Sequence, residues 1–439
     1  MKKESLDYHK KTSKTWIDNY FSILQFGFSG FPEVASLSVR KIFSAETLWK
    51  RLINIIGRFF SLPFRGLYYK FKYRKHTNYD QLKGVPWLLI TSKNNRDVLS
   101  LIKKEIPSAV YFTYEAAVSE EDDIVPLLHF SVWLYSYRFL IVFRYFKEKY
   151  GKRVWSHIDY LFKGVGQYEA CLRFLKKNKP SYIVFSNDHT IFPRALLIAA
   201  KELAIPTIYI QHASITPYFP PLDFDLNLLE GQATLDQYSL NGPVSGTTQF
   251  IGMPKFDPYI KYRNTSKKVT RIGVCSNKMD KTDDVEAFLK DLQKAFPTTT
   301  ITFRPHPADT TTFKIPKEVK LSTNKELAFE FLQKQDLVIA GNTSIHLEAV
   351  LLNVVAIYYE YSPYQSDISD MYLYCKNKLA KNATNKDLLI KIIEAQIVEK
   401  ETKIYERAAY YNAVVGSEYE GRSVALAVEH IHKYIKENN

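Results

Sequence analysis

The sequence predicts an α/β protein in which two parallel sheets, each covered by helices, face a central cleft. The first observation is an alternation of short apolar runs and helix-like segments that starts near Pro86. The second is that a charged, poorly apolar stretch over residues 257–268 interrupts the alternation, which then starts again. Strands that alternate with helices form parallel sheets with right-handed crossovers. Two such series in one chain therefore predict two Rossmann-like domains.

The first series predicts an N-terminal domain over residues 81–258. Its strand-like segments are short apolar runs, and a helix-like segment over 192–204 lies between two of them. The expected strands cover residues 86–91, 108–114, 181–187, 206–212, 226–231 and 247–253. Ligands of such sheets bind outside the carboxyl ends of the strands, so side chains at these ends are candidates for the cleft.

The second series predicts a C-terminal Rossmann-like domain over residues 268–415. Strand-like runs alternate with amphipathic segments, as in the first series. The expected strands cover 270–276, 300–303, 336–342 and 354–359, and the expected helices cover 284–296, 324–334 and 344–353. A further amphipathic segment over 420–437 predicts a closing helix within residues 416–439.

Residues 1–80 form a basic, aromatic-rich arm before the first domain. The chain carries a net charge of +14, and no acidic residue occurs between Leu48 and Tyr79. Residues 50–76 interleave lysine and arginine with large apolar side chains, which suits the surface of an anionic membrane. A partly buried basic helix followed by a linker explains the same composition. Nucleic acid is not an expected partner, because no RRM, KH, zinc-finger or helix-turn-helix pattern accompanies the basic segment.

Cysteine usage and the N-terminus predict a cytoplasmic protein. The three cysteines lie far apart and have no metal-ligand spacing, which favours a reducing compartment. No apolar segment of the kind found in secretory signals follows the basic N-terminus. The apolar run over residues 127–143 contains a histidine and an arginine, so we expect a buried or interfacial helix there and not a membrane span.

The segment TFRPHPAD, residues 302–309, predicts an anion site. Each proline removes a backbone donor and fixes φ, so a strand cannot run far through it. Side chains alternate along a strand, so Arg304 and His306 should point the same way at the strand's carboxyl end.

The segment DLVIAGNTSIHLEAV, residues 336–350, predicts a phosphate pocket beside that anion site. A buried strand runs into Asn342, Thr343 and Ser344 and then directly into a helix, whose free N–H groups attract phosphate. Plain helix capping explains the same three residues. Glu348 lies on an otherwise apolar helix, where a carboxylate is costly without a partner, and it could accept hydrogen bonds from a ribose diol.

Two strand ends of the first domain offer candidate catalytic bases. His212 ends the strand-like run PTIYIQH, and Asp188 follows the neighbouring run SYIVFSN. Either side chain could deprotonate an acceptor hydroxyl. The acidic pair in DFD, residues 223–225, resembles a metal-binding DxD motif but precedes another strand-like run, so we discount it. No GxGxxG, P-loop or HExxH motif is present.

Five segments in this order resemble the GT-B-fold transferases that build bacterial surface polysaccharides. They are QHA at 211–213, IGMPKFD at 251–257, RPHP at 304–307, NTSIHLEA at 342–349, and the closing-helix segment at 416–431. The resemblance is greatest to the HP-motif group, which includes sialyl- and polysialyltransferases, capsule Kdo transferases and teichoic-acid polyol-phosphate transferases. It covers about residues 180–435, and the order and spacing of the motifs carry it more than any single motif.

The resemblance implies a metal-independent glycosyltransferase without a cofactor. His306, Thr343 and Ser344 would bind the phosphate of a nucleotide-activated sugar, with Glu348 near the nucleotide ribose. Protein cations would then stabilise the leaving phosphate, so no metal is expected. The implied partners are the nucleotide-sugar, with a CMP-linked acidic sugar preferred, and a glycan or lipid-linked glycan acceptor. The enzyme would act at the inner face of the membrane.

Departures from the group leave alternatives open. Ala213 stands where teichoic-acid transferases usually carry glycine, and Asp280 is the only remnant of the aspartate segment of retaining Kdo transferases. No clean match to the acidic pair of polysialyltransferases is present. A CDP-glycerol or CDP-ribitol polyol-phosphate transferase, a UDP-sugar 2-epimerase-like enzyme and a non-catalytic subunit of a capsule assembly complex are the alternatives.

Overall fold

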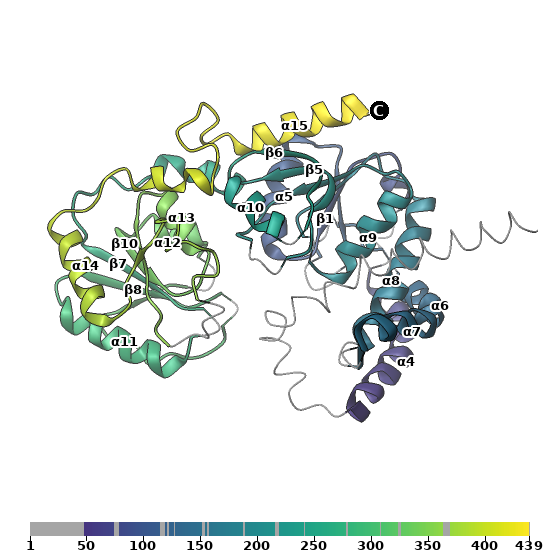
Figure 1. Ribbon diagram of the computed structural model, residues 1–439, viewed down its shortest axis with the longest axis horizontal. Coiled ribbons are helices and arrows are strands. Elements are labelled where there is room, and N and C mark those ends of the chain that lie inside the picture. Colours follow the sequence, from purple (N-terminus) through teal and green to yellow (C-terminus); the bar gives the residue numbers. More distant parts are fainter. Residues whose placement is uncertain are drawn as a thin grey trace, which may run out of the picture.

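The protein is represented by a computed structural model that describes most of residues 48–438 (Figure 1). The gaps in this description are 74–78, 115–118, 121–122, 127, 152–153, 156–157, 188, 216–218, 241, 278–279, 308, 324–325 and 363–368. Two α/β domains lie side by side, and helices cover the faces of both sheets. The predicted α/β fold with two Rossmann-like domains is confirmed.

The first domain is built on a parallel sheet of six strands in the order β2-β1-β3-β4-β5-β6. Its strands are β1 (Trp87–Ile90), β2 (Val110–Thr113), β3 (Ile183–Phe185), β4 (Thr207–Ile210), β5 (Asp223–Leu229) and β6 (Ser245–Phe250). Every residue of β1, β3 and β4 is buried, as expected for a parallel sheet covered on both faces. The strand order changes direction between β1 and β3, which places a topological switch point there.

The second domain is built on a parallel sheet in the order β12-β11-β10-β7-β8-β9. Its strands are β7 (Arg271–Cys275), β8 (Thr300–Arg304), β9 (Lys320–Leu321), β10 (Leu337–Ala340), β11 (Val355–Tyr358) and β12 (Lys381–Asn382). Read from β9, this is the strand order of dinucleotide-binding domains, and the switch point lies between β7 and β10. The loops after β7 and β10 are therefore the expected place for a ligand.

Helices alternate with the strands in both domains. They are α5 (Lys93–Glu105), α8 (Ile158–Lys177), α9 (Ile191–Glu202), α10 (Gln232–Leu240), α11 (Thr282–Ala295), α12 (Ala328–Leu332), α13 (Ile345–Leu351) and α14 (Lys386–Val398). The helix expected over 324–334 is shorter, because α12 alone is helical among the described residues of this range, and 324–325 lie outside them. The carboxylate of Glu330 accepts a hydrogen bond from the backbone N–H of Leu327 at 2.9 Å, which fixes the start of α12.

A separate helical layer packs against α8 of the first domain (Figure 1). It consists of α4 (Leu48–Lys72), α6 (His129–Tyr135), the 3₁₀ turn η4 (Ser136–Arg138) and α7 (Phe139–Tyr150). From His129 onward the apolar run over 127–143 is therefore helical, as expected. Among the described helices, none combines the length and the apolar character that crossing a membrane requires.

The chain crosses between the domains twice. It leaves the first domain through the 3₁₀ segment η6 (Pro254–Tyr262) and returns through η7 (Ile404–Tyr410) to α15 (Ser423–Asn438), which packs on α5 and β5 of the first domain. Leu426 and Ile431 of α15 are buried in the same core as residues of β1 and α5. The C-terminal helix is thus a structural part of the first domain.

The two crossings are fastened to each other. The carboxylate of Asp257 accepts a hydrogen bond from the backbone N–H of Val424 at 2.8 Å. Arg263 forms an ion pair with Glu420 and stacks on the ring of Tyr405, with 3.8 Å between the guanidinium carbon and the ring centre. These contacts join the outgoing segment to the returning one near the domain boundary.

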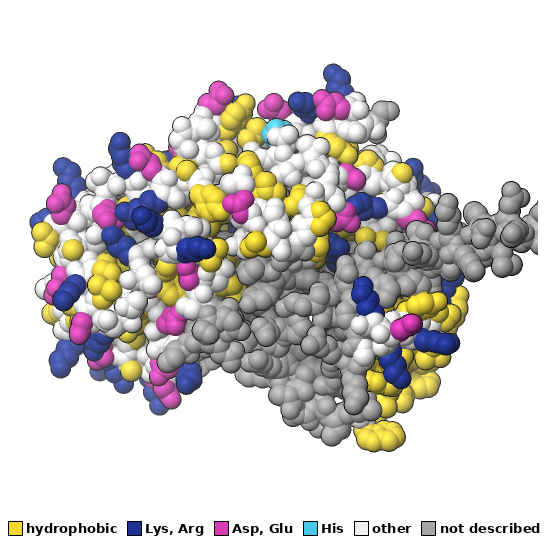
Figure 2. Space-filling view, viewed as in Figure 1, with side chains coloured by type: hydrophobic (Ala, Val, Ile, Leu, Met, Phe, Trp, Pro, Cys, Tyr) yellow, Lys and Arg dark blue, Asp and Glu magenta, His cyan; other side chains and the backbone are white. Residues whose placement is uncertain are grey.

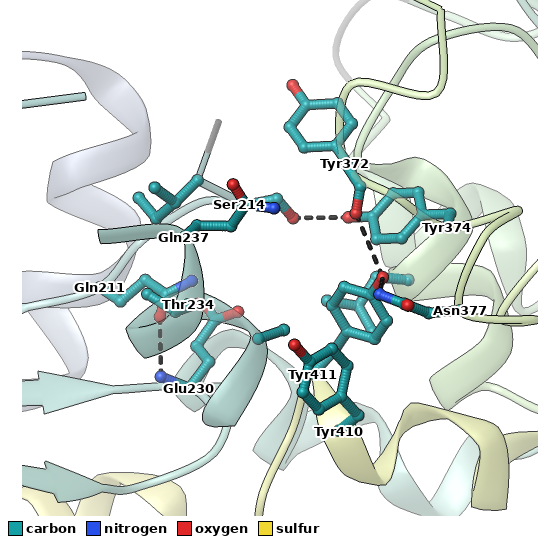
Figure 3. Close-up of a pocket in the computed structure, with 13 residues that line it drawn as sticks. Gln211, Ser214, Glu230, Thr234, Gln237, Tyr372, Tyr374, Asn377, Tyr410 and Tyr411 are labelled. Atoms are coloured by element: carbon teal, nitrogen blue, oxygen red, sulfur yellow. Dashed lines mark hydrogen bonds between the residues drawn. The ribbon is translucent and has the colours of Figure 1, made fainter. Parts of the chain in front are cut away.

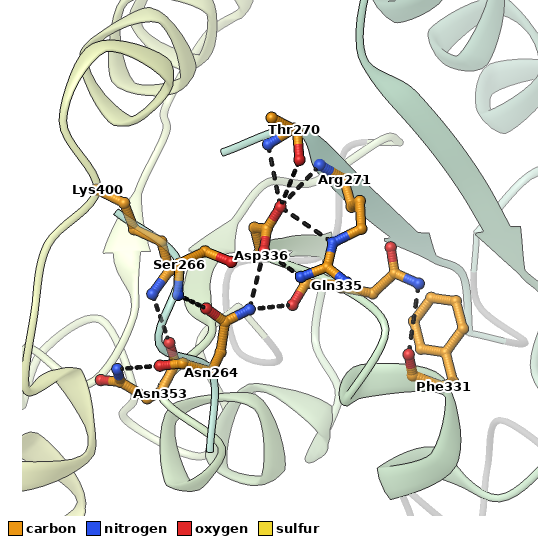
Figure 4. Close-up of polar contacts among 9 residues, drawn as sticks. All are labelled: Asn264, Ser266, Thr270, Arg271, Phe331, Gln335, Asp336, Asn353 and Lys400. Atoms are coloured by element: carbon orange, nitrogen blue, oxygen red, sulfur yellow. Dashed lines mark hydrogen bonds and ion pairs between the residues drawn. The ribbon is translucent and has the colours of Figure 1, made fainter. Parts of the chain in front are cut away.

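A buried aspartate fixes the amino-terminal edge of the second sheet (Figure 4). Asp336, just before β10, is fully buried, and its carboxylate accepts hydrogen bonds from Thr270 N at 3.0 Å, Asn264 Nδ2 at 2.9 Å and Arg271 Nη2 at 2.6 Å. Burial alone would raise the pKa of Asp336, but these hydrogen bonds and the Arg271 charge outweigh it and hold the pKa well below its usual range. The network joins the linker, the start of β7 and the start of β10.

Candidate functional site

A cavity of about 430 Å³ lies between the two domains, at the carboxyl ends of β7, β8 and β10. Its second-domain wall includes the loops after β7 and β10, which flank the switch point. Its first-domain wall is the start of α5 together with the loop after β4. The predicted donor-site residues that line it are Arg304, His306, Thr343, Ser344 and Glu348. Five of the six predicted donor-binding residues therefore share one cavity.

The segment after β8 brings two of the predicted donor-site residues to the cavity. The strand ends at Arg304, directly before Pro305, and both Arg304 and His306 line the cavity. Arg304 is 9% exposed and donates a hydrogen bond from Nη2 to the carbonyl oxygen of Glu326 at 3.2 Å. Its Nε atom is buried without a hydrogen-bond partner in the described part of the chain. A buried guanidinium that is only partly hydrogen-bonded is well suited to an anionic ligand.

The segment before α13 presents two hydroxyl groups to the cavity. Thr343 and Ser344 both line it, and Ser344 occupies the capping position of α13 without making a side-chain capping hydrogen bond. Helix capping therefore does not explain Ser344. Asn342 is buried, and its side-chain oxygen accepts a hydrogen bond from Met371 N at 3.2 Å. Unlike the two hydroxyl residues, Asn342 does not line the cavity, and its contacts hold the loop.

Glu348 faces a lysine that the sequence analysis did not select. Its carboxylate lies 3.8 Å from the Nζ atom of Lys255, at the start of η6. Burial raises the pKa of Glu348, and the charges of Lys255 and Arg304 oppose that rise. Lys255 belongs to the segment IGMPKFD, which was noted only as part of a resemblance. Its position between the domains could not be derived from sequence spacing.

Of the two predicted catalytic bases, the structure describes His212 but not Asp188. His212 is 8% exposed, and burial, together with the positive charges of Lys255 and His189, lowers its pKa to about 3. It is therefore a neutral imidazole at physiological pH, and its Nδ1 atom has no hydrogen-bond partner in the described part of the chain. Asp188 lies outside the described residues.

The remaining acidic candidates have structural contacts. In the discounted DFD segment, Asp223 pairs with Lys201, and Asp225 accepts a hydrogen bond from Thr207 N at 2.8 Å. Asp280 accepts a hydrogen bond from the backbone N–H of its neighbour three residues earlier at 2.7 Å. Within the described residues, no group of three His, Cys, Asp or Glu side chains is placed to hold a metal ion.

A second, smaller cavity of about 20 Å³ contains a carboxyl group that the sequence analysis missed (Figure 3). Glu230 follows β5 and is 1% exposed, and neither of its side-chain oxygens has a hydrogen-bond partner in the described part of the chain. Burial raises the pKa of Glu230 to about 8 despite the opposing charge of Lys255. The sequence did offer one indication, because Glu230 lies at the end of the apolar run LNLLEG, and side chains at strand ends are candidates for the cleft.

The backbone of Glu230 is hydrogen-bonded on both sides, whereas its side chain has no hydrogen-bond partner among the described residues. Glu230 N donates to the side-chain oxygen of Gln211 at 2.8 Å, and the carbonyl oxygen of Glu230 accepts from Ala413 N at 2.9 Å. Across the cavity, the hydroxyl groups of Ser214 and Tyr374 lie 2.6 Å apart and join the two domains. The carboxyl group is thus positioned by its main chain in a polar space between the domains.

The two cavities are neighbours. Consecutive residues of the loop after β4 line them, with Ala213 in the larger and Ser214 in the smaller, and consecutive residues of α13 do the same. The charge of Lys255 also acts on both Glu230 and Glu348. Glu230 lines the smaller cavity, and His212 lines neither of the two.

Comparison with known proteins shows the fold alone. No family model matches the chain, and no curated protein matches its sequence. A Listeria monocytogenes protein assigned as a UDP-N-acetylglucosamine 2-epimerase has a similar structure, with a TM-score of 0.52, 10% identity, and coverage of 81% of this chain and 98% of that chain. A variant of the wall teichoic acid polymerase TagF is similar with a TM-score of 0.50, 12% identity, and coverage of 87% and 98%. Both likenesses extend across the two domains, so the overall GT-B-like architecture is shown.

Proposed function

We propose that the protein is a glycosyltransferase that moves a sugar from a nucleotide-activated donor to a growing cell-surface polysaccharide or glycolipid. The observation that carries the proposal is the convergence of Arg304, His306, Thr343 and Ser344 on one cavity at the switch point of a dinucleotide-binding-type sheet. A CMP-linked acidic sugar is the preferred donor, on the resemblance described above. The similar structures of a teichoic acid polymerase and of a protein assigned as a UDP-N-acetylglucosamine 2-epimerase support the two-domain fold that the proposal requires.

In the proposed reaction the second domain stabilises the leaving phosphate. The acceptor oxygen forms a bond to the sugar as the bond between the sugar and the donor phosphate breaks, and negative charge develops on the phosphate oxygens. Arg304 and His306 would approach that charge from the end of β8, while the Thr343 and Ser344 hydroxyls would donate from the loop before α13. Donors fixed by a folded framework need little rearrangement as charge develops, which is the main source of such stabilisation. Glu348 would accept hydrogen bonds from the nucleotide ribose.

The first domain would supply the group that takes the proton from the acceptor hydroxyl. His212 and Asp188 stay proposals from the sequence. Glu230 is added because its carboxyl group is buried, positioned by its main chain and without a hydrogen-bond partner among the described residues. A general base works best when its pKa lies near the working pH. The pKa of about 8 for Glu230 meets this condition more closely than the pKa of about 3 for His212. Glu230 is therefore our first choice among the three.

The alternative functions differ in what they need from the two domains. A CDP-glycerol or CDP-ribitol transferase would need the same phosphate site, and a UDP-sugar 2-epimerase-like enzyme would need no acceptor. A non-catalytic capsule subunit would not need an unpaired acid such as Glu230 in the cleft, and a buried carboxyl group is costly to keep without a function. We therefore rank the non-catalytic subunit lowest.

Nucleotide binding tests the proposal. We expect one of CMP, CDP, UDP and GDP to raise the melting temperature of the full chain. His306→Ala and Ser344→Ala should each weaken the binding of that nucleotide by about 1.5–3 kcal/mol, which is the typical contribution of a hydrogen bond to a charged group. His432→Ala and Ser239→Ala, on the outer surface of α15 and α10, are the matched controls and should bind normally. A chain that no nucleotide stabilises, or two cleft variants with unchanged affinity, would refute the donor site.

Association with the inner face of an anionic membrane is the remaining part of the proposal. Residues 50–76 were expected to bind such a surface, and α4 contributes the exposed cations Arg65, Lys70 and Lys72. Placing the cleft near the membrane would bring it to a lipid-linked acceptor. The side chain of Arg58, which belongs to the same expectation, lies outside the described part of the chain.

A further inference from the structure

The outer face of α4 is a continuous apolar stripe. Trp49 is 75% exposed and Phe71 is 87% exposed, and the exposed residues between them recur every three or four positions along the helix. This spacing places them on one face. The full set is Trp49, Ile53, Ile56, Phe60, Phe64, Leu67, Tyr68 and Phe71.

The helices α6 and α7 carry a second exposed stripe. Their inward positions, Val132, Val142 and Phe146, are buried in the core of the first domain, as any packed helix requires. Their outward positions are also apolar, although a helix on a soluble surface usually presents polar side chains there. These outward residues are Phe130, Leu134, Tyr137, Leu140, Ile141 and Tyr145.

The two stripes belong to one surface because α4 and α6 are in contact. The ring of Phe59 lies 5.6 Å from that of Trp133, and the ring of Tyr69 lies 4.7 Å from that of His129. A Cβ atom placed on Gly66 would meet the backbone nitrogen of Phe130 at 3.4 Å, so the helices approach closely at that point. In Figure 2 the hydrophobic side chains gather over this helical layer, with lysine and arginine beside them.

Positive charge accompanies this surface. The sequence of α4 contains no acidic residue, and the sequences of α6, η4 and α7 contain only Glu148. Exposed cations occur at the ends of both stripes, with Lys70 and Lys72 on α4 and Lys147 and Lys149 on α7. An apolar surface accompanied by cations is complementary to the headgroups and upper acyl chains of an anionic bilayer. A second copy of the chain would bring two sets of like charges together, which the same argument disfavours.

We propose that α4 and α6–η4–α7 form a single membrane-docking surface, so that α7 is bound to the bilayer as directly as α4 is. Both helices lie in the membrane plane, with their inner stripes on the protein and their outer stripes among the lipid headgroups. This goes beyond an N-terminal arm alone, because the surface is built into the first domain and fixes the orientation of that domain on the membrane. The inference does not depend on which donor the cleft binds.

Vesicle binding by the full chain tests the surface. The variant Leu140→Glu/Ile141→Glu changes α7 and leaves α4 intact, and Leu240→Glu on α10 is the matched control, because Leu240 is 75% exposed and Leu140 is 72% exposed. We expect the α7 variant to bind phosphatidylcholine–phosphatidylglycerol vesicles roughly tenfold or more weakly, since two large apolar side chains are lost from the lipid contact. The control should bind normally, and added salt should weaken the wild-type chain.

Three results would overturn the proposal. The first is full vesicle binding by the α7 variant, which would confine docking to α4. The second is equal binding of the wild-type chain to neutral and anionic vesicles, which would remove the charge complementarity. The third is a dimer in sedimentation equilibrium that the α7 variant dissociates, which would make a second copy the occupant. Far-UV circular dichroism melts establish that each variant is folded before binding is measured.

Discussion

Two buried acids on opposite sides of the domain boundary have opposite surroundings. Asp336, at the amino-terminal edge of the second sheet, accepts hydrogen bonds from a linker asparagine, a threonine and an arginine, and its pKa lies well below its usual range. Glu230, at the carboxyl end of a first-domain strand, makes no side-chain hydrogen bond in the described part of the chain, and its pKa is raised to about 8. Folding therefore favours the ionised form of Asp336 and disfavours the ionised form of Glu230.

The difference separates a structural acid from a functional candidate. Buried polar groups in folded proteins are almost always hydrogen-bonded, because an unpaired one costs free energy. Asp336 follows that rule and fastens segments that are distant in sequence. Glu230 breaks it at the place where two domains face each other, and such exceptions concentrate at sites that bind or transform a ligand. The same residue type thus has different roles, and its hydrogen-bond partners indicate which.

The largest expected effect is on turnover in Glu230→Gln. The carboxamide keeps the shape of the side chain but cannot take a proton from an acceptor hydroxyl. Transfer of the sugar should fall by about 10²–10⁴-fold while nucleotide affinity stays constant, the usual consequence of removing a general base. The assay uses the nucleotide-sugar whose nucleotide gives the largest thermal shift.

His212→Ala is the companion variant for that measurement. If His212 alone is the base, the loss of turnover should occur in this variant, and Glu230→Gln should retain full activity. Full turnover in both variants would exclude both residues and leave Asp188 as the first-domain candidate. The measurement thereby decides whether the unpaired acid differs from Asp336 in function as well as in its surroundings.

The next effect is on stability in Asp336→Asn. This substitution leaves Arg271 and the backbone donors without their anionic partner, so the free energy of unfolding should fall by about 3 kcal/mol. Asp291→Asn is the control, because Asp291 pairs with Lys386 at the surface and both side chains are about half exposed. Its loss should stay below about 1 kcal/mol. Equal denaturation midpoints for the two variants would show that Asp336 is not a structural anchor.

The smallest effect is on the pH dependence of stability, where the two acids should act in opposite directions. The folded pKa of Glu230 lies above its ordinary value of 4.5, so the folded chain binds more protons, and stability should decrease as pH rises toward about 8. Relaxation and entry of water limit the loss to about 1–2 kcal/mol over this range. Glu230→Gln should flatten the decrease.

Asp336 provides the opposite test at acid pH. Its folded pKa lies below the ordinary value of 3.8, so its contribution is present above that value and is lost as the pH falls below it. Thermal melts of the wild-type chain and both variants across pH resolve the two trends. A melting temperature that rises between about pH 5 and about pH 8 only in the wild-type chain would contradict the assignment for Glu230.

The alternation of strands and helices was sufficient to predict both sheets, because parallel strands buried on both faces read as short apolar runs. The end of β8 was predictable for a local reason, since Pro305 follows Arg304 and cannot continue the ladder. The two-residue strands β9 and β12 were not found, because two residues carry no periodicity. The short helix α12 was predicted too long, since its start depends on a side-chain contact between Glu330 and the backbone of Leu327.

The sequence was more informative about the second-domain residues that line the larger cavity than about Lys255 and the first-domain residue Glu230. Arg304, His306 and Ser344 belong to strand-end segments whose chemistry is visible in sequence. Lys255 lies on the outgoing segment between the domains, and Glu230 is held by the returning one, through the hydrogen bond from Ala413 N to the carbonyl oxygen of Glu230. Such contacts join residues far apart in the chain, so no local pattern encodes them. An unpaired carboxyl group can be recognised only when its neighbours are known.

The double crossing of the chain between the domains has a mechanical consequence. A single linker would let one domain twist and tilt freely relative to the other, but here the outgoing segment η6 and the returning segment before α15 are fastened by the Arg263–Glu420 ion pair and the hydrogen bond to Asp257. Any change in the angle between the domains must therefore move both segments together, because these contacts tie one segment to the other.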